Sequence, residues 1–192
     1  TYSPAKTVEF MDKAGIETAL ISSVGPGIHF GDISQTRRLA REVNEYGAKL
    51  CADYKGRYGL FATLPVLDPD ATLREIEYVF DTLKADGIGL LTSYGGTKWL
   101  GDSLFAPMYE ELNRRKAIVY SHPTDPPCCA HSNEHYINVP GLSSTTIEYN
   151  TDTSRSIINV IMSGTAARYP DIRFLWSHAG GTITGLAGRF LG

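Results

Sequence analysis

Short apolar runs alternate with amphipathic segments along the whole chain. Runs of apolar and β-branched residues bounded by Gly, Pro or polar positions are typical of buried strands. Such runs cover residues 18–22, 58–64, 88–91, 117–121 and 173–177. The intervening segments expected to be helical cover residues 32–54, 68–83, 104–115, 152–163 and 180–191. Because strands that alternate with helices pair in parallel through right-handed crossovers, the pattern predicts an α/β fold.

Two of the expected helices begin with recognisable capping residues. Asp68 stands before Pro69, a pair typical of an N-cap and the first helical position. Asp152 is expected to cap the helix that it begins, and Arg155 to pair with neighbouring residues rather than with a substrate. No internal repeat or shift in composition divides the chain, so residues 1–192 are expected to form a single domain.

Two of the apolar runs end in a histidine. His122 closes the run at 117–121, and His178 closes the run at 173–177. The carboxyl ends of strands are where α/β barrels place their chemistry, and imidazole is the commonest protein metal ligand. The two histidines are therefore candidate functional residues. The alternative is that each one only satisfies hydrogen bonds at the end of its strand.

Loops on the same expected face supply further candidates. His29 lies in a Gly-rich loop after the first strand and is a candidate for lining a pocket. Tyr94 and Trp99, in the loop 92–102, could stack on an aromatic ring, and Lys98 could meet a carboxylate. The alternative for each is a solvated loop whose aromatic side chain packs on its own turn.

Composition narrows the class of protein. With 42% hydrophobic and 20% charged residues and a net charge of −3, the chain has neither a basic stripe for nucleic acid nor a polybasic patch for membranes. No apolar run reaches the roughly 18 residues of a membrane span, and residues 1–15 do not resemble a signal peptide. Three cysteines make no disulfide framework, so reduced thiols and a cytoplasmic location are expected.

A compact cluster of cysteines and histidines suggests a zinc site at first sight. It consists of Cys128, Cys129, His131 and His135, within a polar stretch from 123 to 149. Structural zinc sites space paired cysteines by two to four residues so that both sulfurs reach the ion. Adjacent cysteines rarely bind one ion together. We therefore expect a polar loop that covers the functional face, since loops of this length are usually functional or mobile.

Six segments occur in an order that resembles a known family. They are residues 87–95, 99–102, 111–115, 121–124, 151–155 and 177–182. Together they resemble the decarboxylase branch of the amidohydrolase superfamily, which includes 6-methylsalicylate, γ-resorcylate and 2-amino-3-carboxymuconate-6-semialdehyde decarboxylases. The resemblance implies a (β/α)8 TIM-barrel fold with one divalent metal ion, expected to be zinc, with manganese as the alternative.

The resemblance also implies roles for three residues. His122 matches the metal ligand that ends the fifth barrel strand. His178 matches the sixth-strand histidine, which handles protons or positions the substrate. Arg189 matches an arginine that, in some relatives, crosses a dimer interface to hold the substrate carboxylate, so a homodimer is expected. The alternative for Arg189 is a surface arginine on its helix.

Other features of the family are missing from this sequence. No His-x-His or Glu-x-His pair stands near Thr1, and no aspartate that could end an eighth strand follows the His178 strand. The 192 residues are also fewer than the roughly 250 of a complete barrel. We therefore expect an incomplete barrel covering about strands 2 to 6, truncated at both ends and inactive by itself.

These features together predict a metal-dependent, non-oxidative decarboxylase acting on a hydroxylated aromatic carboxylic acid, such as a salicylate-type acid. A divalent ion can bind the carboxylate and phenolic oxygens together, and a nearby acid can protonate the ring carbon. One alternative is a metal-dependent hydrolase of the same superfamily acting on a lactone or amide. A second alternative is a non-catalytic interaction module.

Overall fold

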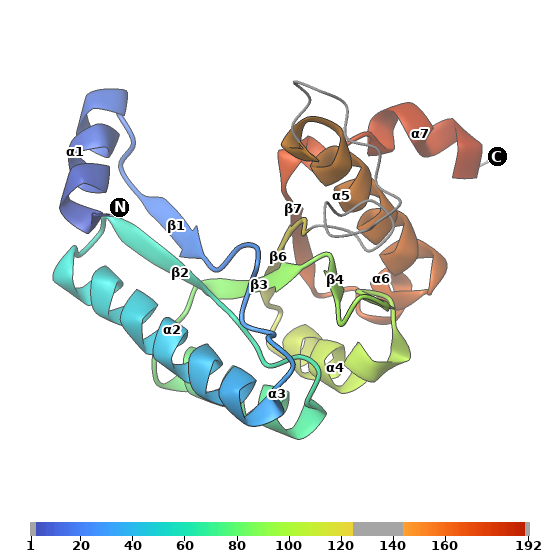
Figure 1. The fold of residues 1–192 in the computed structure, drawn as a ribbon, viewed down its shortest axis with the longest axis horizontal. Helices are drawn as coiled ribbons and strands as arrows, with labels where there is room; N and C mark the ends of the chain where they lie inside the picture. Colours follow the sequence, from blue (N-terminus) through green and yellow to red (C-terminus); the bar gives the residue numbers. More distant parts are fainter. Residues whose placement is uncertain (1–2, 125–143, 191–192) are drawn as a thin grey trace.

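A parallel sheet forms the centre of the computed structural model, which describes residues 3–124 and 144–190. Its strands are β1 (Ala19–Ser22), β2 (Tyr58–Ala62), β3 (Gly87–Leu91), β6 (Ile118–His122) and β7 (Arg173–Trp176). They lie in the order β1-β2-β3-β6-β7, and every pair is parallel. Each strand therefore pairs with its predecessor in the sheet (Figure 1), as in one arc of a barrel. The predicted fold class and all five predicted strands are confirmed.

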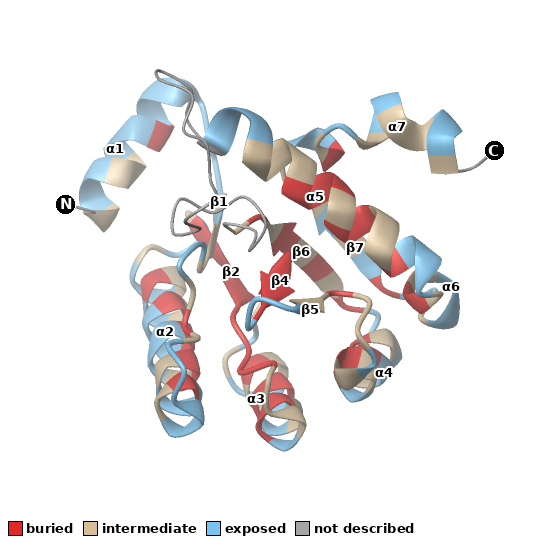
Figure 2. Ribbon diagram, turned by 45° about the vertical axis from the view of Figure 1, so that its right-hand side comes forward, coloured by how far each residue is buried: buried red, intermediate tan, exposed pale blue. Residues whose placement is uncertain are grey.

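Helices connect the strands and flank the sheet. They are α1 (Pro4–Ala14), α2 (Ile33–Asp53), α3 (Pro69–Asp81), α4 (Ala106–Arg114), α5 (Ser144–Met162), α6 (Thr165–Arg168) and α7 (Ile183–Phe190), with 3-10 turns η1 (Ser103–Phe105) and η2 (His178–Gly180). Figure 2 shows α2, α3 and α4 side by side along one side of the sheet, with α5 beside β6 and β7. No helix in the described ranges is long and apolar enough to span a bilayer.

The predicted start of α3 is confirmed, whereas that of α5 is wrong. The Asp68 side chain accepts a hydrogen bond from the Ala71 amide at 3.2 Å, and Pro69 occupies the first turn. Helix α5 instead begins at Ser144, so Asp152 lies in its third turn and caps nothing. Asp152 faces the protein interior with no measurable exposure. Its carboxylate meets residues after β3 and β6 rather than the first amides of its own helix.

Helix α1 and the hairpin after β3 are among the elements that were not predicted. Helix α1 is capped by Ser3 and ends at Gly15, whose φ of 70° lies in the left-handed region. Of its residues only Met11 is buried, so its apolar stripe is too thin to give a clear pattern. The loop after β3 forms a small antiparallel hairpin of β4 (Ser93–Tyr94) and β5 (Lys98–Trp99). Strands of two residues are shorter than any periodicity can reveal.

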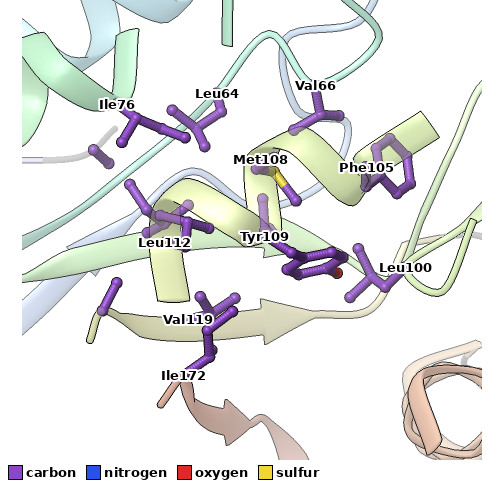
Figure 3. Close-up of a cluster of buried hydrophobic side chains, with 14 of the residues drawn as sticks. Leu64, Val66, Ile76, Leu100, Phe105, Met108, Tyr109, Leu112, Val119 and Ile172 are labelled. Atoms are coloured by element: carbon purple, nitrogen blue, oxygen red, sulfur yellow. The ribbon is translucent and has the colours of Figure 1, made fainter. Parts of the chain in front are cut away.

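The main core lies between the sheet and the row α3–α4. Figure 3 shows Met108 and Leu112 of α4 among the buried side chains of this cluster, which also includes Ile76 of α3 and Val119 of β6. Ile76, Leu112 and Val119 have no measurable exposure. The strands β2, β3 and β6 and the helices α3 and α4 both contribute side chains to this core, as expected for a parallel sheet covered by helices.

A buried amide joins α2 to the segment after β2. The Asn44 side chain accepts a hydrogen bond from the Thr63 amide at 2.8 Å and donates to the Thr63 carbonyl at 2.9 Å. It also donates to the Glu75 carboxylate at 2.9 Å, and Glu75 in turn binds Arg41. Asn44 therefore holds the segment after β2 in place, because it forms hydrogen bonds with both the N–H and the carbonyl of Thr63.

Replacing Asn44 by leucine is expected to lower the free energy of unfolding of the full-length protein by about 3 kcal/mol, because buried polar groups lose their partners. Urea denaturation followed by circular dichroism measures the change. The matched control is Asn113→Leu, which removes a similar hydrogen bond to the exposed Asp171 amide and is expected to cost less than about 1 kcal/mol. Equal losses in the two variants would contradict the role assigned to Asn44.

Candidate active site

His122 is the last residue of β6 and lies at the carboxyl end of the sheet. The Thr92 amide donates to the His122 carbonyl at 3.0 Å, which extends the pairing of β3 and β6 by one residue. The His122 Nδ1 atom lies 2.8 Å from the Pro123 carbonyl oxygen. Because a carbonyl only accepts, Nδ1 carries the hydrogen and Nε2 keeps its lone pair. A histidine oriented in this way by a carbonyl is typical of metal ligands.

The surroundings of His122 favour its neutral form. Burial lowers the pKa of His122 below its ordinary value, and the nearby His178 lowers it further. The hydrogen bond to the Pro123 carbonyl acts in the opposite direction and is weaker than the burial effect. Metal binding requires a deprotonated imidazole nitrogen, so this environment suits a ligand.

His178 approaches His122 from the next strand. It follows β7 after one residue, Ser177, and the two imidazole rings lie 5.5 Å apart between centroids. The side chain of His178 is exposed, unlike the half-buried ring of His122. The sequence therefore placed both histidines at one edge of the sheet, and the structure brings their rings together.

The backbone at His178 is unusual. His178 and Ala179 have φ values of 51° and 53°, in the left-handed region that residues other than glycine rarely adopt. Close packing of the following residues against α5 holds this conformation: a Cβ atom at Gly181 would collide with the Asn150 carbonyl. The Thr182 amide also donates to the Ser154 hydroxyl at 2.8 Å. Strained backbone of this kind clusters at functional sites.

Tyr149 of α5 completes a group of three rings. Its ring centroid lies 6.0 Å from that of His122 and 6.1 Å from that of His178. Tyr149 is not among the candidates from the sequence, because the polar stretch 123–149 indicates a loop there. The three-residue spacing between Tyr149 and the buried Asp152 was the available signal, since it puts both on one helix face.

His29 and Tyr94, the candidates from the loops after β1 and β3, lie beside a cavity. His29 and Tyr94 line a cavity of about 140 Å³ together with Leu91 and Thr124, at the carboxyl end of β3. Their rings meet edge to face at 4.9 Å. The Tyr94 hydroxyl accepts a hydrogen bond from the Leu91 amide at 2.8 Å, and burial raises the pKa of this hydroxyl. Burial also lowers the pKa of His29 to about 4, so His29 is neutral at pH 7.

Trp99 and Arg189 are not in contact with the ring group in the described structure. Trp99 is half-buried in β5, and its neighbour Lys98 forms an ion pair with Asp102 at 3.1 Å. Arg189 is exposed near the end of α7, a helix without buried residues. Figure 1 shows α7 extending away from the sheet. Arg189 makes no ion pair with any other described residue.

The residues present fit part of a metal site. His122 offers one correctly oriented nitrogen, but the described ranges contain no group of three or more His, Cys, Asp or Glu side chains that could hold an ion. The cluster of Cys128, Cys129, His131 and His135 lies outside the described residues. His122 can thus serve as one ligand of a larger set.

Comparisons with known proteins point to one family. The sequence model of the family described as Amidohydrolase matches residues 2–189. The chain is 43% identical to decarboxylase yanB of Aspergillus niger, covering 98% of this chain and 52% of the relative. It is 38% identical to the 6-methylsalicylic acid decarboxylase of Penicillium expansum, covering 88% and 51%.

A solved structure agrees with these relatives. The 5-carboxyvanillate decarboxylase LigW of Sphingomonas paucimobilis superposes with a TM-score of 0.87 at 25% identity, covering 98% of this chain and 55% of the other. The chain therefore spans about half the length of the proteins that it matches.

Proposed function

Because the chain belongs to the amidohydrolase family, we propose that the full-length protein is a metal-dependent, non-oxidative decarboxylase of a hydroxylated aromatic carboxylic acid of the salicylate type. The pair of imidazoles at the carboxyl end of the sheet, 5.5 Å apart between centroids, carries this proposal. The relatives named as decarboxylases, one of them acting on 6-methylsalicylic acid, support the choice of reaction.

His122 supplies one ligand through Nε2, while its Nδ1–H stays bound to the Pro123 carbonyl. Imidazole suits zinc well, so we propose zinc, with manganese as the alternative. When bound, such an ion would hold the substrate carboxylate and phenolic oxygen and withdraw charge from the ring. Other residues of the full-length protein would complete the ligand set.

His178 delivers the proton that replaces CO2 on the ring carbon. Its imidazole is close to His122 yet exposed, so it can exchange protons with solvent and reach a substrate held beside His122. A positioned general acid of this kind contributes about 10²–10⁴-fold to a rate. The left-handed backbone at His178 fixes the direction of the side chain.

Aromatic residues near His122 and His178 form the walls of the substrate pocket. Tyr149 offers a ring to the side of both histidines, where a benzoate ring can stack. His29, Tyr94 and Trp99 complete the walls on the side of β3 and its hairpin. Arg189 would reach the pocket of a partner subunit in a homodimer and hold the substrate carboxylate there.

The test compares CO2 release from two hydroxybenzoates that differ in the position of the hydroxyl group. We expect the full-length protein, supplied with zinc or manganese, to release CO2 from 6-methylsalicylate and leave 3-hydroxybenzoate unchanged. Only an ortho hydroxyl lets one ion bind both oxygens. Liquid chromatography of the phenolic product measures the reaction. Hydrolysis of an aromatic lactone such as dihydrocoumarin, without CO2 release from any hydroxybenzoate, would favour the hydrolase alternative.

A further inference from the structure

A buried polar contact links α5 to the segment that follows His122. Asp152 and Thr92 are both fully buried, and the Thr92 hydroxyl donates to the Asp152 carboxylate. The Thr124 amide donates to both, with distances of 3.3 Å to Thr92 Oγ1 and to Asp152 Oδ2. A carboxylate without measurable exposure is costly to bury, so its position next to a candidate metal ligand calls for an explanation.

The peptide group between Pro123 and Thr124 connects this contact to His122. The N–H of this peptide group, from Thr124, donates to Thr92 and Asp152. Its carbonyl, from Pro123, accepts the hydrogen bond of His122 Nδ1. A peptide group is planar, and in the trans form its N–H and C=O point in opposite directions. Fixing the N–H toward Asp152 and Thr92 therefore aims the carbonyl at the imidazole.

We propose that Asp152 and Thr92 are positioning residues, which set the tautomer and ring orientation of His122 through the Pro123–Thr124 peptide group. The expected effect of Asp152 and Thr92 on metal affinity rests on the proposed function, in which His122 is a metal ligand. Their expected effect on the tautomer of His122 does not depend on that function. Thr92 acts on His122 twice, because its own amide also donates to the His122 carbonyl. Neither residue touches the substrate.

The test uses Thr92→Val in the full-length protein, which removes the hydroxyl while keeping the shape of the side chain. The matched control is Thr72→Val. Thr72 is equally buried, and its hydroxyl donates to the Pro65 carbonyl at 3.0 Å, away from the site. Thr92→Val is expected to lower the unfolding temperature more than Thr72→Val, because it takes a donor from a buried carboxylate. The two variants are therefore compared by readouts at His122, under conditions in which both are folded.

Two readouts distinguish positioning from a merely structural contact. The first is the tautomer of His122 in the metal-free protein, from ¹⁵N spectra of histidine-labelled samples assigned with His122→Gln. The second is the zinc affinity, from competition with a chromophoric chelator. Only Thr92→Val is expected to lose the single Nδ1–H form and to bind zinc about 10–100-fold more weakly, as found when partners of ligating histidines are removed. Thr92→Ser is expected to restore both values.

An unchanged His122 spectrum in folded Thr92→Val protein would overturn the proposal. If Thr92→Val does not fold, Asp152→Asn is judged by the same two readouts, since it removes the charge but retains an acceptor. A changed tautomer with unchanged zinc affinity would support the positioning role and count against His122 as a ligand. The failure of the proposed function is thereby separated from the failure of this inference.

Discussion

Replacing His122 by alanine in the full-length protein is expected to abolish metal binding and decarboxylation together. Replacing His178 is expected to leave the metal in place and to lower turnover by about 10²–10⁴-fold. The reason is geometric: His122 has its Nδ1–H bound to a carbonyl and its Nε2 free of that bond, whereas His178 stands beside it as an exposed second ring.

Elemental analysis of both purified variants, together with their rates of CO2 release, measures the difference. The two variants serve as controls for each other, because each removes one imidazole from the same ring group. Equal metal loss in both would mean that the division of roles is wrong. Full activity in His178→Ala would assign the proton to another residue.

Arg189→Ala is expected to lower kcat/KM by about 10²-fold, which corresponds to the loss of a charged, two-pronged hydrogen bond to a carboxylate. Arg189→Lys is expected to restore little, because an ammonium group cannot form the two parallel bonds. Arg189 is exposed on α7 and forms no ion pair with another residue that the structure describes, which is what such a role across an interface requires.

Subunit exchange tests whether Arg189 acts in the partner's site. In a mixture of Arg189→Ala and His122→Ala proteins, each heterodimer holds one site with His122 from one chain and Arg189 from the other. Such a heterodimer is expected to show about half the activity of the wild-type dimer, since one of its two sites is intact. Absence of recovery after proven exchange would place Arg189 outside the partner's site.

The sequence predicted the sheet well because of how parallel strands are buried. The strands β2 and β3 are buried at every position, so they appear as continuous apolar runs. The hairpin of β4 and β5 and the thin stripe of α1 carry no such signal. The family was predicted from six ordered motifs, and the match over residues 2–189 confirms it.

The candidate site was predictable only where strand ends determine it. His122 and His178 close apolar runs, and parallel pairing brings such ends together. The contact between Asp152 and Thr92 could not be predicted from the sequence, because the two residues are 60 positions apart. Helix periodicity indicates which residues share a buried face, but not which residues that face contacts. The sequence predicts Asp152 as a cap because aspartate is common at the N-cap position. Its place on one stripe with the buried Ser156 and Val160 was the contrary signal.

The order of strands in the sheet also bears on how the chain acquires its structure during synthesis. Within the described residues, each strand of this sheet after β1 pairs with the sheet strand made before it, so none of these four pairs needs a strand from much later in the chain. A polypeptide leaving the ribosome can add one strand at a time to a growing edge, and contacts between neighbours in sequence favour rapid folding. The last strand, β7, pairs only with β6 among the described strands, so the earlier pairs form their hydrogen bonds without it.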